Sequence, residues 1–297
     1  MSVSAFVAVL VTAVLGADPV PVTPVRPFES LAASAPVGKI DKLVFGRLKE
    51  LGLQPSPLCS DAVFVRRIYL DVIGTLPTAA EAREFLLDRN PDKRRVLIDG
   101  LLQRDEFADY WAMKWSDLLR IKAEFPINLW PNAAQAYYHW IRTSIRENKP
   151  YDRFTRELLT PSGSNFRVPQ VNFYRAIQSR QPTAISQAVA LALMGVRAEK
   201  WPPERLAGMS AFFAKIGYKS TAEWKEEIVF FDPNALSPKE PAKGAGRNAT
   251  KTRVSPRVAP VFPDGTAAHI PPDRDPREAF ADWLIDAKNP WFARNIV

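Results

Sequence analysis

The sequence predicts a mainly α, multi-helix globular domain with a small peripheral β element, for three reasons. Apolar residues recur at spacings of three and four along most of the chain, as on the buried face of a helix. Most prolines lie between these periodic stretches, where they interrupt helices. Hydrophobic residues make up 46% of the 297 residues, which is enough to form a packed core.

The first two predicted helices each carry one apolar stripe and each end at a glycine, Gly52 and Gly74. The stripes consist of Ile40, Leu43, Val44, Leu48 and Leu51, and of Phe64, Val65, Ile68, Val72 and Ile73. Thr78 with Glu81 three residues later forms a capping box, which predicts a short third helix. A fourth helix is expected after Pro91. We expect the stripes between residues 40 and 215 to close over one another into one helical body.

A further helix places two indoles one turn apart. Phe107, Trp111, Trp115 and Leu118 recur at spacings of four, four and three, so they share one helix face. That face is either a stacking platform for a ligand or part of the core. We expect core, because Leu118 continues the stripe.

The second half of the predicted domain contains its most apolar helix. Asp152 is expected to cap a helix near residue 154, and residues 181–196 carry no charge at all. Residues 183–194 therefore predict the central buried helix. Pro202 and Pro203 suit the first turn of the next helix, and the β-prone residues 228–231 predict one strand.

The N-terminal residues predict export. Residues 5–16 form an apolar run that fits a signal peptide at 1–17 and is too short for the roughly 20 residues of a membrane span. A buried N-terminal segment or a misplaced start codon is the alternative. Residues 18–38 contain five prolines and predict an extended tether, and the helical domain follows at 39–232. We expect a periplasmic or extracellular protein without a stable transmembrane span.

Residues 233–272 predict a linker. Between residues 239 and 257 six basic residues face a single acid, Glu240, and a flexible linker explains this run without a nucleic-acid partner. Elsewhere Lys and Arg mostly alternate with Asp and Glu along helix faces, which is typical of solvated surfaces. We therefore expect no nucleic-acid partner despite the net charge of +8. A last helix begins near Asp275, within 273–297. It either packs back on the main domain or opens a second domain.

Residues with metal-binding or nucleophilic side chains are scarce. Cys59 is the only cysteine, and His139 and His269 are the only histidines. We therefore expect no metal site, no haem and no other cofactor, and we assign His139 a structural role. The phosphate-binding loop, the dinucleotide fingerprint and the G-x-S-x-G elbow are all missing from the sequence, so catalytic residues stay unassigned.

A set of charged and aromatic residues on two predicted helices forms the candidate site. Its members are Arg66, Arg67, Asp71, Trp111, Trp115, Asp117 and Arg120. Arg67 and Asp71 stand four residues apart and can meet on one helix face. The set is either a polar pocket or a partly buried ion-pair network joining two helices. We favour the network, because arginine forks are well suited to bridging helices.

Four motifs carry a family resemblance. They are FVRRIYLDVIGTLPT at 64–78, KRRVLID at 93–99, YWAMKWSD at 110–117 and NKPYDRF at 148–154. Together they resemble the planctomycete secreted-cytochrome-associated domain of unknown function, over roughly residues 40–232. The segment NPWFAR within 275–297 resembles the opening of the partner domain that usually follows, here truncated.

The resemblance implies a fold and an exported location, but no established activity. Many relatives carry Cys-x-x-Cys-His after a Gly-Val-Arg like that ending at Arg197, whereas this chain reaches Trp201 without a cysteine, so a haem role is not carried over. Our leading hypothesis is an exported binding or scaffold module with protein partners in an envelope or extracellular assembly. The alternatives are an extracellular hydrolase that uses Asp71 or Asp117, and a haem-free subunit of an electron-transfer complex. Oligomeric state stays open.

Overall fold

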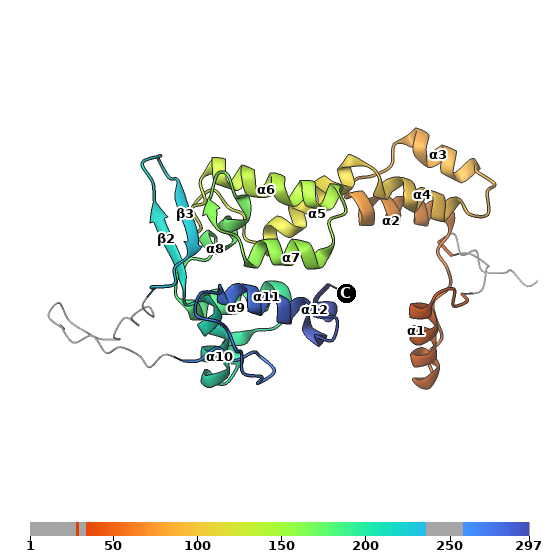
Figure 1. Cartoon of the computed structure of the whole chain (residues 1–297). Coiled ribbons are helices and arrows are strands. Elements are labelled where there is room, and N and C mark those ends of the chain that lie inside the picture. The colour runs from red at the N-terminus through yellow and green to blue at the C-terminus, as the bar shows by residue number, and fades with distance from the viewer. Residues whose placement is uncertain (1–27, 30–33, 236–257, 297) are drawn as a thin grey trace, which may run out of the picture. The chain divides into compact units, whose positions relative to one another are not determined.

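A computed structural model describes residues 28–29, 34–235 and 258–296 (Figure 1). The predicted signal peptide, most of the predicted tether and the basic run 239–257 lie outside these residues. The described part is mainly helical and contains a three-stranded antiparallel sheet, so the predicted fold class is confirmed. It divides into two compact units, one formed by residues up to 67 with 77–88 and one by 68–76 with 89–297.

The smaller unit contains helices α1 (Lys39–Glu50) and α3 (Ala79–Leu87), with the first half of α2 (Asp61–Ile73). The predicted capping box begins α3: the backbone N–H of Glu81 donates to the Thr78 hydroxyl at 3.2 Å, and the Thr78 N–H donates to the Glu81 carboxylate at 2.7 Å. The rings of Phe64 and Phe85 stack 5.8 Å apart and join α2 to α3.

Helix α1 forms where the sequence predicts it, but the residues that the structure describes leave its apolar face uncovered. Gly52 follows it with a φ of +68°, as expected of a glycine that ends a helix. None of its residues is buried, and Ile40 and Leu43 are 75% and 76% exposed. The expectation that all stripes between residues 40 and 215 close over one another is therefore wrong for α1. Periodicity identifies an apolar face without identifying what covers it.

The larger unit holds the remaining elements. Its helices are α4 (Lys93–Leu102), α5 (Asp105–Leu118), α6 (Pro131–Arg146), α7 (Tyr151–Leu159), α8 (Asn172–Arg175), α9 (Pro182–Met194), α10 (Pro203–Ser210), α11 (Pro276–Ile285) and α12 (Pro290–Ile296). Short 3-10 turns occupy Pro169–Val171, Ala198–Lys200 and Ala211–Phe213. The strands β1 (Gly163–Ser164), β2 (Ile216–Ser220) and β3 (Glu227–Phe231) form a sheet of order β1-β3-β2. The strand predicted at 228–231 is confirmed as β3. Helix α7 begins after Pro150 without a side-chain cap, so the predicted Asp152 cap is wrong.

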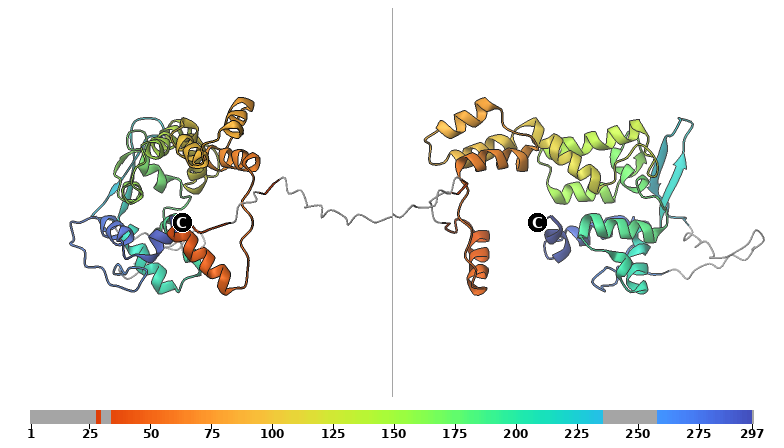
Figure 2. Two further views of the ribbon diagram at one scale, coloured as in Figure 1. Left: turned by 90° about the vertical axis from the view of Figure 1, so that its right-hand side faces the viewer. Right: turned by 180° about the vertical axis from the view of Figure 1, so that it is seen from behind.

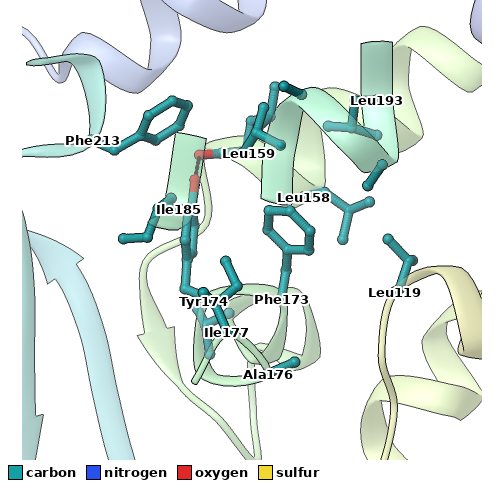
Figure 3. Packing of buried hydrophobic residues seen from close by; sticks show 14 of the residues in the cluster. Leu119, Leu158, Leu159, Phe173, Tyr174, Ala176, Ile177, Ile185, Leu193 and Phe213 are labelled. Atoms are coloured by element: carbon teal, nitrogen blue, oxygen red, sulfur yellow. Dashed lines mark hydrogen bonds between the residues drawn. The ribbon is translucent and has the colours of Figure 1, made fainter. Parts of the chain in front are cut away.

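Helix α9 lies at the centre of the larger unit, as its uncharged sequence predicts. It buries the seven residues Ile185, Ser186, Val189, Ala190, Ala192, Leu193 and Met194. Figure 3 shows Ile185 and Leu193 among side chains from α7 and α8, including Leu158 and Phe173. The Tyr174 hydroxyl donates to the backbone carbonyl of Leu159, which joins α8 to α7. Gly195 ends the helix in the left-handed conformation.

The C-terminal segment packs back on the helical domain, which was one of its two predicted alternatives. Phe280 of α11 is fully buried, with its ring centroid 5.4 Å from that of Phe212 and 5.3 Å from that of Phe213. Phe262, inside the predicted linker, stacks on Phe212 at 4.8 Å and on Trp283 at 5.3 Å. Residues 258–272 are therefore part of the packed unit.

Across residues 28–29, 34–235 and 258–296, none of the helices combines the length and the apolar character that a bilayer crossing requires.

Candidate functional site

The end of α5 builds one wall of the candidate site. The N–H of Ile121 donates to the carbonyl of Ser116 at 2.9 Å, and the N–H of Arg120 donates to the carbonyl of Asp117 at 3.2 Å. This pair of hydrogen bonds is a Schellman motif, which places Arg120 at the left-handed position that glycine usually occupies. Arg120 has a φ of +62°, a conformation that costs an L-residue roughly 1–2 kcal/mol.

A pocket of about 270 Å³ opens between this helix end and α9. Its lining residues are Asp117, Leu118, Leu119, Arg120, Phe173, Ala176, Ile177, Ala188, Leu191 and Ala192. The buried side chains of Leu119, Phe173 and Ile177 form its apolar interior, and these three lie near one another in Figure 3. Leu118 and Leu191 are 44% and 49% exposed. The pocket thus joins a buried interior to an exposed apolar surface.

Two charged residues line this pocket. Asp117 and Arg120 are both exposed, and within the described part of the chain neither side chain makes a hydrogen bond or an ion pair. Asp117 is the one carboxylate among the lining residues. A polar ligand group at the mouth could therefore pair with either charge without breaking a contact inside the protein.

The two candidate tryptophans lie partly inside the fold. The Trp115 ring stands edge-on to Phe154 with centroids 5.3 Å apart and packs against the buried core. The Trp111 indole N–H donates to the carbonyl of Val72 at 3.1 Å, which ties α5 to α2. Both side chains are half-buried.

The candidate charged residues on α2 are exposed. Arg66, Arg67 and Asp71 are all exposed, whereas the ion-pair network favoured from the sequence would be partly buried. The first two belong to the smaller unit and Asp71 to the larger one. The structure therefore brings only Asp117 and Arg120, of the candidate set, to one pocket.

A second polar cluster was not predicted from the sequence. The Glu227 carboxylate on β3 accepts from the Arg175 guanidinium at 3.1 Å and from Arg180 at 2.7 Å, and the Arg180 guanidinium lies 4.3 Å from the centroid of the Tyr218 ring. Burial raises the pKa of Tyr218 to about 12, and the nearby Arg180 cation partly offsets this. The cluster joins α8 to the sheet. The two arginines lie 52 and 47 residues before Glu227 in sequence, so no local spacing reveals these ion pairs.

Side chains able to bind a metal ion are dispersed among the described residues. Among them, no group of three or more His, Cys, Asp or Glu side chains is arranged to hold a metal ion. His139 is exposed on α6 rather than packed in the core, so the structural role assigned to it is not supported by burial.

Comparison with known proteins finds a family but no characterised relative. No curated protein and no solved structure shows significant similarity to the chain. Residues 39–199, which run from the start of α1 to the turn after α9, match the family described as "PSCyt2: Protein of unknown function (DUF1549)". The match covers more than half of the chain and includes every residue that lines the pocket. The chain belongs to this family of proteins of unknown function.

Proposed function

We propose that the chain is a protein-binding module whose α5–α9 pocket accepts an apolar side chain of a partner protein. The partner belongs to an envelope or extracellular assembly, a location that rests on the apolar run at residues 5–16.

The size and lining of the pocket support a side chain rather than a metabolite. Its volume of about 270 Å³ falls just below the roughly 300–1,000 Å³ of pockets that hold drug-sized ligands. Protein interfaces concentrate their binding energy where one bulky side chain fills such a pocket and surrounding contacts exclude water. The half-exposed Leu118 and Leu191 supply those surrounding contacts, and Asp117 and Arg120 supply a polar rim.

The backbone conformation of Arg120 is the observation that carries the proposal. Glycine would adopt a φ of +62° without strain, yet arginine occupies the position. The side chain stabilises no neighbour within the described residues. A residue held in a costly conformation without a structural role at a pocket mouth is a candidate for ligand recognition.

The substitution Arg120→Gly tests the role of the Arg120 side chain in binding without lowering the stability of the fold. Removing the left-handed strain leaves the free energy of unfolding unchanged or raises it by about 1 kcal/mol, while loss of the cation weakens binding. Binding is measured by methyl NMR of the full chain titrated with N-acetyl-phenylalanine amide, a model of one partner side chain. We expect saturable shifts at the methyl groups of Ile177 and Leu191, and weaker binding in the variant.

A matched pair of leucines provides the control. Leu191→Glu places a charge at the pocket and should abolish the shifts. Leu102→Glu alters a leucine on α4 that is 41% exposed and should leave them unchanged. Shifts spread over the surface, or binding that is unchanged in both the Arg120→Gly and the Leu191→Glu variant, would show that the pocket is not a binding site.

A further inference from the structure

A second surface lies where the β2–β3 hairpin meets the start of α6 (Figures 1 and 2). Trp224, in the hairpin turn, is 72% exposed. Its ring stands edge-on to that of Trp130 with centroids 4.9 Å apart, and the Lys225 ammonium lies 4.5 Å from the Trp130 centroid. Two adjacent indoles, one of them largely exposed, make this aromatic surface a candidate interaction site.

Side-chain hydrogen bonds fix the hairpin turn in place. The Glu226 carboxylate accepts from the hydroxyls of Ser164 and Thr221. The Asn165 side chain, which is fully buried, donates to the carbonyl of Lys225 at 3.2 Å and accepts from the N–H of Glu227 at 2.9 Å. Trp224 is therefore presented on a supported turn, so little conformational entropy is lost when a ligand stacks on it.

An open groove begins in the first turn of α6, directly after Trp130. This groove is shallow and widely open, and it is lined by Asn132, Gln135, Ala136, Tyr138 and His139. Most of these residues are spaced three or four apart and so share one face of α6. Within the described residues, the side chains of Asn132, Gln135 and His139 make no hydrogen bond to the protein.

We propose that the Trp130–Trp224 pair and this groove together form a binding site for a neutral oligosaccharide. A pyranose ring has a face of C–H groups, which packs on an indole, and an edge of hydroxyls, each both donor and acceptor. The amides of Asn132 and Gln135 also offer both a donor and an acceptor. The indoles and the amides therefore supply the two kinds of contact that a sugar needs.

The lining of the groove favours a neutral sugar over a charged polymer. No Lys, Arg, Asp or Glu lines it, whereas single-stranded nucleic acids are held in positively charged grooves. The Lys225 ammonium lies against the two indole rings and so belongs to the aromatic platform. This inference uses none of the residues that line the α5–α9 pocket, so the two proposals can fail separately.

Isothermal titration of the full chain with cellohexaose, chitohexaose and mannohexaose tests the site. At least one of these sugars should bind saturably at micromolar to millimolar concentration. Trp224→Ala should weaken that binding about tenfold or more, a loss of roughly 1.4 kcal/mol. Gln135→Ala should weaken it several-fold without affecting the hairpin.

Gln103→Ala, at an exposed amide beyond the end of α4, is the matched control and should bind as the unaltered chain does. Circular dichroism confirms that each variant folds. Absence of saturable binding to all three sugars would overturn the proposal, as would affinity that survives both Trp224→Ala and Gln135→Ala. Trp224-dependent binding of oligodeoxythymidine without any binding of sugar would assign the surface to nucleic acid instead.

Discussion

The Tyr218 side chain places an ionisable group in a buried position. Its hydroxyl is buried and has no hydrogen-bond partner among the described residues, although the guanidinium of Arg180 faces its ring. An unsatisfied buried hydroxyl costs roughly 1–3 kcal/mol. The hydroxyl therefore destabilises the fold even at neutral pH.

Tyr218→Phe should raise the free energy of unfolding by about 1 kcal/mol near pH 8. Burial raises the folded-state pKa of Tyr218 to about 12, above the roughly 10 of an unfolded tyrosine. Between these values the folded state binds more protons, so stability falls as pH rises through this window. The variant should lose part of that alkaline decline, as measured by urea unfolding near pH 8 and near pH 11.

Tyr137 and Tyr174 also have raised pKa values because both are buried, so part of the alkaline decline should remain in the variant. Tyr110→Phe, at a half-buried tyrosine on α5, serves as the control and should preserve the full decline. A Tyr218→Phe variant that is less stable than the unaltered chain near pH 8 would mean that the hydroxyl has a favourable contact after all.

Four neighbouring residues, Thr78 to Glu81, set the start of helix α3. Thr78→Ala removes the hydroxyl that accepts the Glu81 N–H and should destabilise the helix by about 1 kcal/mol. Amide hydrogen exchange over Ala79–Leu87 should measure that loss as faster local opening. Thr75→Ala, at an exposed threonine just before the helix, should leave the exchange unchanged, and equal effects of the two substitutions would exclude the capping box as the cause.

Elements could be predicted from sequence where their causes are local. The capping box at the start of α3 and Gly52 just after α1 lie at the ends of the helices they define, and both follow from side-chain and backbone chemistry over a few residues. Strand β1 is two residues long and exists only because Gly163 and Ser164 pair with β3. Such a strand has no periodicity of its own.

The candidate site could be predicted only in part, for the same reason. Asp117 and Arg120 were identified from their charge, but the pocket they line needs Leu191, which is more than 70 residues away in sequence. The apolar stripe of α1 predicted burial, yet whether a face is covered depends on elements that spacing does not reveal. Local chemistry thus identifies candidate residues, and tertiary packing decides which of them meet.

At the scale of the whole molecule, a buried arginine attaches the C-terminal helix to the central domain. Arg277 is 1% exposed and its guanidinium pairs with Asp275 at 2.7 Å. It also donates to the carbonyl of Pro161 at 2.9 Å and to the Ser162 hydroxyl at 3.2 Å. A buried cation with these partners requires α11 to sit in one position against the end of α7.

Phe280→Ala tests whether α11 and the central helices unfold as one unit. The fully buried ring packs against Phe212 and Phe213, so its loss should cost about 3–5 kcal/mol. If the packing is cooperative, amide exchange in α9 should accelerate together with that in α11, because both open in the same transition. Ile296→Ala, at a 52% exposed residue of α12, should change stability by less than about 0.5 kcal/mol. Faster exchange confined to α11 would instead mean that the C-terminal segment is an independently unfolding addition to the domain.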